Sequence, residues 1–371
     1  MLMSDSRFRE LAIGELERIT ECRPIRTLSI LDKYISILET DTDILERYNR
    51  DIKDNIFSYA LVSLIDHDFD ADRISDLSEI VKGVLPKGKR FRIFVKNFVD
   101  IGMTQREAEI SIGVKIESAN NPVDLVNPEV AVVVILSDRA MIGVSYDENQ
   151  NYAITSILHP KNTERRSQIN RSEVKLAEAI AYFRIDTDRI SRCIDVGAAP
   201  GGWSDIMLRY GKSVIAIDSA MLDYKSLCRY GNVMVYVPSE EAGLEGLVSR
   251  IDSNIGVERI ENLKVPDGVM LIHIKSNADE GIIRRILKET KADALLVDYN
   301  LTPPESTKLV LNLSELLSSN GILVFTIKIN NRNVNYTVNM AIDAISSIYR
   351  DIRVRKLVHN RREVTLFGIK R

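Results

Sequence analysis

Features that mark secreted, metal-binding and membrane proteins are scarce in this sequence of 371 residues. Its three cysteines (Cys22, Cys193 and Cys228) lie far apart and form no C-x-x-C pair, so neither a disulfide framework nor a zinc site is indicated. The four histidines do not cluster, and we expect no metal. No apolar run approaches the roughly 20 residues that span a bilayer, and the charged start MLMSDSRFRELA is not a secretory signal. We therefore expect a reduced, cytoplasmic protein without a membrane partner.

A strong excess of one charge is also missing, because 50 Lys and Arg face 53 Asp and Glu and the formal net charge is −3. The chain as a whole therefore does not predict a nucleic-acid binder. The distribution is more informative, since basic residues gather in 159–175 and again in 350–371. Local basic clusters suit a phosphate backbone, although a solvated charged face gives the same pattern.

The length is enough for two or three domains. Residues 1–56 are expected to form a helical or α+β subdomain, with amphipathic helices over 8–19 and 28–38. In residues 57–146 strand-like apolar runs replace the helical pattern, and we interpret this range as a second module. The polar, basic stretch 147–171 is interpreted as a linker, and 172–371 as the catalytic domain.

Alternating and apolar runs predict an α+β pattern in the second module. Strands are expected over 57–65, 90–98, 130–136 and 140–145, and a helix over 74–85. A further helix over 104–116 begins with Thr104 and has Glu107 three residues later, which is the signature of a capping box.

The most informative stretch is 193–222, CIDVGAAPGGWSDIMLRYGKSVIAIDSAML. A short apolar strand runs into Gly197, Gly201 and Gly202, a helix follows, and a second strand ends on Asp218. Glycines let a backbone approach a ligand closely, and an acid at the tip of the next strand is well placed for ribose hydroxyls. The pattern is not the G-x-G-x-x-G of dinucleotide sites. It predicts the nucleoside-binding half of a doubly wound α/β domain.

Four charged residues elsewhere stand at places where such a sheet binds ligands. Lys175 lies on an amphipathic helix before the first strand, and Asp298 ends the buried run ALLV. Lys328 ends the apolar run 321–327, where a lysine needs a partner or has a depressed pKa. Glu363 leads into the last strand. Each has an ordinary structural explanation when taken alone.

Together these residues resemble the FtsJ-like ribose 2'-O-methyltransferases, and within them the M-type large-subunit ribosomal RNA enzymes. The segment D-x-G-x-x-P-G-G-W and the order Lys, Asp, Lys, Glu carry the resemblance over most of 165–371. It implies a Rossmann-like class I methyltransferase domain, a mixed seven-stranded sheet flanked by helices, with S-adenosylmethionine as cofactor. The implied catalytic residues are Lys175, Asp298, Lys328 and Glu363. The implied cofactor-binding residues are Asp195, Gly197, Ala199, Pro200, Gly201, Gly202, Trp203, Asp218, Asn277 and Asp298.

The resemblance also suggests roles. Lys328 is favoured as the base that takes the hydroxyl proton, with Lys175 as a nearby cation that lowers its pKa. Asp298 would orient Lys328, and Glu363 would hold Lys175 or the hydroxyl. The adenine contact is open, because the stretch after the third strand offers either Asn277 or Asp279. The chain between 221 and 268 is longer than compact family members need, and 230–237 is a candidate extra strand there.

The pieces RFRIFVKNF, SIGVKIES, VDLVNPEVAVVVIL and AMIGVS resemble a THUMP domain. That resemblance implies an RNA-binding module upstream of the catalytic domain. Its candidate phosphate contacts are Lys87, Lys89, Arg90, Arg92 and Lys96.

The leading hypothesis is therefore methyl transfer from S-adenosylmethionine to a ribose 2'-hydroxyl of a structured RNA, preferably large-subunit rRNA. A tRNA substrate and a non-catalytic RNA-binding protein with a methyltransferase fold remain alternatives. Base methylation is disfavoured, because the stretch DYNLTPP after the fourth strand has no aromatic residue behind its prolines. No DNA partner is expected.

Overall fold

The computed structural model describes the chain except residues 41–43, 51–55, 68–70, 119, 127, 160–168, 239–254, 262, 264, 266–267, 278–279 and 330–332. The chain divides into two compact units, Met1–Thr163 and Glu164–Arg371. Each unit is described by itself below.

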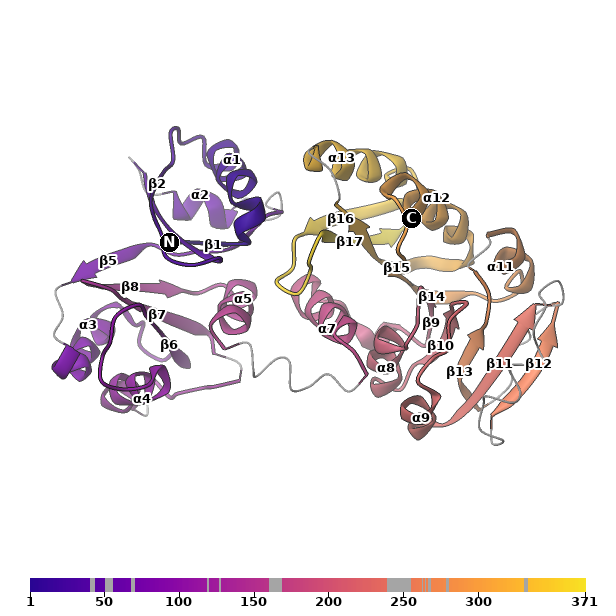
Figure 1. The fold of residues 1–371 in the computed structure, drawn as a ribbon, viewed down its shortest axis with the longest axis horizontal. Helices are drawn as coiled ribbons and strands as arrows, with labels where there is room; N and C mark the ends of the chain where they lie inside the picture. The colour runs from indigo at the N-terminus through magenta and orange to yellow at the C-terminus, as the bar shows by residue number, and fades with distance from the viewer. Residues whose placement is uncertain are drawn as a thin grey trace. The chain divides into compact units, whose positions relative to one another are not determined.

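The first unit contains two four-stranded sheets, with strand orders β2-β3-β1-β4 and β5-β8-β7-β6 (Figure 1). The first sheet and its helices are β1 (Leu2–Ser4), α1 (Arg9–Thr20), β2 (Arg26–Ile30), β3 (Ile35–Glu39), α2 (Leu45–Arg50) and β4 (Ser58–Leu61). The second sheet and its helices are β5 (Leu64–His67), α3 (Leu77–Val84), β6 (Phe91–Asn97), α4 (Gln105–Ile116), β7 (Val130–Leu136), β8 (Ala140–Ser145) and α5 (Glu148–Leu158).

The helix expected over 28–38 is wrong, because this stretch forms the antiparallel strands β2 and β3. Asp32 sits between them, and its Oδ1 accepts hydrogen bonds from the backbone N–H groups of Tyr34 at 2.7 Å and Ile35 at 2.8 Å. An aspartate side chain that bonds to nearby backbone groups in this way favours a turn over a continuing helix. The apolar residues that mimic helical spacing therefore belong to a hairpin.

The strand expected over 57–65 is two strands in two sheets. β4 pairs with β1, whereas β5 pairs with β8, and Val62 and Ser63 separate them. The remaining strands and helices of the second module are confirmed, including the complete capping box of Thr104 and Glu107. The range expected as a linker contains helix α5 at its start, and its 160–168 portion lies outside the described residues. The THUMP assignment stays a prediction.

The second unit is built on one nine-stranded sheet with the order β12-β11-β13-β10-β9-β14-β15-β17-β16. Its first half contains α7 (Ser172–Phe183), β9 (Arg192–Val196), α8 (Gly202–Arg209), β10 (Ser213–Ile217), α9 (Tyr224–Leu227), β11 (Asn232–Pro238), β12 (Gly256–Ile260) and β13 (Val269–Ile274). Its second half contains α11 (Glu280–Ile286), β14 (Ala292–Val297), α12 (Pro303–Leu313), β15 (Leu317–Lys328), α13 (Val334–Ile345), β16 (Tyr349–Arg355) and β17 (Glu363–Lys370).

The seven strands expected of a class I methyltransferase are present, and β11 and β12 extend the sheet by two parallel strands beyond β13. The extra strand suggested for 230–237 is confirmed as β11. All described pairings in this sheet are parallel except those of β17, which runs antiparallel to both β15 and β16. The mixed α/β fold is therefore as expected, with a wider sheet.

The chain leaves β9 toward β10 and later returns to the other side of β9 through β14. Sheets of this kind bind ligands at the carboxyl ends of the strands beside such a reversal of strand order. Helices α7, α8 and α9 lie on one side of the sheet, and α11, α12 and α13 on the other (Figure 1). In the described part of the chain, every helix is too short or too polar to cross a membrane.

Candidate active site

The carboxyl ends of β9, β10, β14 and β15 bring most of the expected site residues to one edge of the sheet. Gly197 follows β9, Asp218 follows β10, Asp298 follows β14, and Lys328 is the last residue of β15. Because β17 runs antiparallel to β15, its first residue reaches the same edge, and Glu363 pairs in register with Lys328. The reversed direction of β17 therefore adds Glu363 to the residues that the parallel strands bring to this edge.

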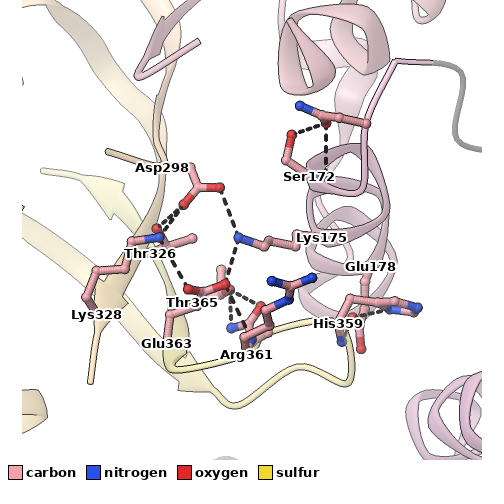
Figure 2. A network of polar contacts seen from close by, with 12 residues as sticks. Ser172, Lys175, Glu178, Asp298, Thr326, Lys328, His359, Arg361, Glu363 and Thr365 are labelled. Atoms are coloured by element: carbon pink, nitrogen blue, oxygen red, sulfur yellow. Dashed lines mark hydrogen bonds and ion pairs between the residues drawn. The ribbon is translucent and has the colours of Figure 1, made fainter. Parts of the chain in front are cut away.

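The four expected catalytic side chains form a closed network of alternating charge (Figure 2). The Nζ atom of Lys175 lies 3.2 Å from Asp298 Oδ2 and 2.6 Å from Glu363 Oε1. The Nζ atom of Lys328 lies 3.0 Å from Asp298 Oδ1 and 3.2 Å from Glu363 Oε2. Their side chains are between 7% and 16% exposed, so little water screens these contacts.

The electrostatics correct one expectation. Burial favours a lower pKa for Lys328, but Asp298 and Glu363 outweigh it and raise this pKa above its ordinary value. Burial likewise acts to raise the pKa of Asp298 and of Glu363, but the two lysines outweigh it and lower both values. The depressed pKa expected for Lys328 is therefore wrong for the free protein, because each lysine has two carboxylates within contact distance.

Two supporting residues escaped the sequence analysis. Thr326 is fully buried, and its hydroxyl donates to Asp298 Oδ1 at 2.7 Å. Its position two residues before Lys328 places it on the same face of β15, a signal available from the strand period. Glu178, one turn beyond Lys175 on α7, accepts hydrogen bonds from the backbone N–H and the ring of His359.

The glycine-rich turn 197–202 has the expected backbone. Gly197 (φ +80°) and Gly201 (φ +116°) adopt left-handed conformations, and α8 begins at Gly202. The backbone N–H of Ala199 donates to Asp218 Oδ2 at 3.0 Å, which ties the turn to the tip of β10. Trp203 is 2% exposed within the core, and its indole N–H donates to the backbone oxygen of Ser172. Trp203 therefore fixes α7 against α8.

Asp195 lies at the base of this turn with a carboxylate oxygen that has no hydrogen-bond partner among the described residues. It is 1% exposed, Oδ2 accepts from Ser204 at 2.7 Å, and Oδ1 is unpartnered. Burial raises the pKa of Asp195 to about 7. A buried acid with an open acceptor, glycines that leave room for a ligand and a carboxylate at the tip of β10 fit a cofactor with a cationic amino-acid end and a ribose.

His273 supports the expected ribose-binding acid through the backbone. It is fully buried, and burial lowers its pKa to about 4. Its Nε2 lies 3.0 Å from the backbone oxygen of Asp218, which can only accept, so this nitrogen carries the proton. Its Nδ1 then accepts from the hydroxyl of Tyr224 at 2.5 Å. Asn277 is exposed after β13, and Asp279 lies outside the described residues.

A methyl group at Gly197 tests how tightly the turn packs against the site. The Cβ of alanine would lie 2.7 Å from the backbone oxygen of Asp298, closer than real contacts allow. We expect Gly197→Ala to lower the free energy of unfolding by about 3 kcal/mol, measured by urea unfolding, and to displace Asp298. Gly211→Ala is the matched control, because Gly211 has a similar φ of +73° with open space around it and incurs only the backbone strain. Equal losses in both variants would contradict the close packing.

Residues 168–237 match the family model of the FtsJ-like methyltransferases. An uncharacterised protein of Methanocaldococcus jannaschii is 26% identical over 208 residues, 56% of this chain and 47% of that protein. Ribosomal RNA large subunit methyltransferase M of Shewanella denitrificans is 27% identical over 156 residues, 40% of each chain. The chain spans less than half the length of these curated relatives. The crystal structure of TrmN from Thermus thermophilus aligns with 100% of this chain and 98% of its own at 17% identity, with a TM-score of 0.33.

Lys175 and the glycine turn lie within the matched segment 168–237, whereas Asp298, Lys328 and Glu363 follow it. The described residues contain no group of three or more His, Cys, Asp or Glu placed to hold a metal ion. The ionisable groups of the site are instead two amines and two carboxylates that can hold a hydroxyl and exchange protons with it.

Proposed function

We propose that this protein transfers a methyl group from S-adenosylmethionine to a ribose 2'-hydroxyl in a structured RNA, preferably large-subunit rRNA. The observation that carries the proposal is the closed network of Lys175, Asp298, Lys328 and Glu363 beside the glycine turn. S-adenosylmethionine would supply an electrophilic methyl group on a sulfonium. Asp195, Asp218 and the backbone of the turn would hold it.

The acceptor hydroxyl must be positioned and must lose a proton, and the network supports both steps. A hydroxyl bound at Lys328 Nζ would take the place of one of its carboxylate partners. Losing that partner removes part of what raises the pKa of Lys328. Lys328 would then release one proton to solvent and, as a neutral amine, take up the proton that the hydroxyl loses. Asp298, held by Thr326, would keep the lysine oriented.

The RNA partner is supported by the first unit and by the names of the relatives. Two relatives from Shewanella, both named ribosomal RNA large subunit methyltransferase M, are 27% identical to this chain over 156 residues and 32% identical over 115 residues. Four elements of the module 57–146, β6, α4, β7 and β8, lie where the THUMP resemblance predicts strands and a helix, which supports an RNA-binding role for it. We therefore assign RNA binding to this module and methyl transfer to the second unit.

Methyl transfer can be tested directly with labelled S-adenosylmethionine and total RNA from cells that lack the protein. We expect the full chain to label RNA, and nucleoside mass spectrometry to place the label on ribose as a 2'-O-methyl nucleoside. Comparing purified large-subunit rRNA with tRNA identifies the substrate. A label on a base would overturn the ribose assignment, and a label confined to tRNA would overturn the rRNA preference. No labelling of any RNA would leave a protein that binds RNA without modifying it.

A further inference from the structure

The basic cluster 350–371 is largely committed to contacts within the protein. Arg350 pairs with Asp351, and Arg353 donates to the backbone oxygen of Phe183. Arg355 is 2% exposed and Lys356 is fully buried. At the other end, Lys370 donates to the backbone oxygens of two residues, and Arg371 to that of a third. These residues stabilise the sheet and offer little to a ligand.

Arg361 and Arg362 are different. Both are exposed, and neither guanidinium pairs with a carboxylate in the part of the chain that the structure describes. They lie on the loop 356–362 between β16 and β17, immediately before Glu363. Consecutive Cα atoms are about 3.8 Å apart, so both backbones are close to the catalytic network. Figure 2 shows Arg361 beside Glu363 and Lys175.

The network itself does not attract phosphate. Its two lysines and two carboxylates cancel in charge, and both acids keep their charge because their pKa values are lowered. An RNA strand that places a ribose there carries a phosphate on each side of that ribose. A cation outside the network has to neutralise them, and the unpaired guanidiniums nearest in sequence are those of Arg361 and Arg362.

The loop is held rigidly by contacts at several points. Glu178 accepts from the backbone N–H groups of Val358 at 2.7 Å and His359 at 3.0 Å, and from the His359 ring at 2.8 Å. Asn360 donates to Thr365 at 2.9 Å, and the backbone oxygen of Arg362 accepts from Ile329 at 2.6 Å. A loop ordered before binding avoids part of the entropy cost of ordering it on the ligand.

We propose that Arg361 and Arg362 form a phosphate clamp, which binds the RNA backbone next to the target ribose and sets that ribose against Lys328. The clamp rests on the proposed function. By contrast, candidate phosphate contacts in the THUMP-like module are partly engaged, since Lys89 pairs with Glu129 at 2.9 Å and Arg90 with Asp124 at 2.8 Å. Guanidinium groups suit the clamp because they bind phosphate through two parallel hydrogen bonds.

The test measures binding of a fluorescein-labelled 12-mer oligouridylate to the full chain over a salt series. Each phosphate contact on a single strand contributes about 0.7 to the slope of log affinity against log salt. We expect Arg361→Gln/Arg362→Gln to reduce the slope by about 1.4 and to weaken binding about tenfold at low salt. The matched control is Lys288→Gln/Lys308→Gln, which removes two exposed cations after α11 and on α12 and should leave both quantities unchanged.

Two further variants make the outcome decisive. Arg361→Lys/Arg362→Lys keeps both charges and should keep the slope, while raising KM for RNA through loss of the paired hydrogen bonds. If the melting temperature of the double Gln variant falls, the single variants Arg361→Gln and Arg362→Gln are measured in its place. Each should change the slope by about 0.7. If the wild-type protein binds and methylates RNA but the Gln variants keep the wild-type salt slope, the clamp alone is overturned. A full chain that neither binds nor methylates RNA overturns the proposed function and the clamp together.

Discussion

Lys328→Ala should lower kcat for methyl transfer by about 1,000-fold, because positioned acid–base groups contribute about 100- to 10,000-fold. The side chain that is removed touches Asp298 at 3.0 Å and Glu363 at 3.2 Å, and it is our proposed proton acceptor. Binding of S-adenosylmethionine, measured by calorimetry, should change little, because the glycine turn and Asp218 are left intact. Lys308→Ala, an exposed lysine on α12, is the control and should keep full activity.

Lys328→Arg separates proton acceptance from positive charge. Arginine keeps the ion pairs with Asp298 and Glu363 but does not lose its proton in proteins. We expect it to be as inactive as alanine. Activity recovered in Lys328→Arg would show that a fixed charge suffices, and a near wild-type rate in Lys328→Ala would remove Lys328 from the mechanism. Because two carboxylates raise the pKa of Lys328, the wild-type rate should also rise with pH into the alkaline range.

Asp195→Asn should change how the stability of the second unit depends on pH. Burial raises the pKa of Asp195 to about 7 from an ordinary value of 3.8. The folded protein therefore holds a proton that the unfolded chain has already released. This contribution to stability is complete below the unfolded pKa and is lost as the pH rises through about 7. Between about pH 5 and about pH 8 the loss is roughly 3 kcal/mol.

Asparagine is neutral at every pH and removes this loss. We expect the free energy of unfolding of Asp195→Asn to fall by about 3 kcal/mol less than that of wild type over the same pH interval. Urea unfolding followed by tryptophan fluorescence reports the right unit, because the chain has one tryptophan, Trp203, buried in its core. Asp188→Asn, an exposed acid of the same unit, should leave the pH dependence as it is. Parallel curves for wild type and Asp195→Asn would contradict a neutral Asp195 in the folded state.

Asp298 and Lys328 were recognisable in the sequence as candidate site residues because each stands at the end of an apolar strand. Apolar runs that end on Asp298 or Lys328, and a glycine turn that ends the run through Val196, are local signals. The raised pKa of Lys328 could not be predicted in this way. It depends on Asp298 and Glu363, which contact Lys328 only after β14 and β17 are placed in the sheet. Thr326 is an ordinary strand residue in the sequence, and its role follows only from the hydrogen bond that its hydroxyl donates to Asp298.

The fold shows the same division between local and distant causes. The capping box of Thr104 and Glu107 was readable because it involves four consecutive residues. The hairpin of β2 and β3 was not, because its apolar residues fit a helical period and its turn depends on one side chain, Asp32. The width of the sheet was predicted only in part: the extra strand suggested for 230–237 is β11, whereas β12, at the edge of the sheet, was not expected.

The antiparallel strand β17 has a consequence for synthesis of the protein. The site draws on Lys175 near the start of the second unit and on Glu363 near its end, and β17 inserts between β15 and β16, both of which are made before it. A nascent chain emerging from the ribosome can thus form the glycine turn and bury Trp203 while Lys328 still lacks Glu363. Under the proposed mechanism, methyl transfer requires that β17 has paired with β15 and β16. The measured activity would then report that this sheet is fully formed.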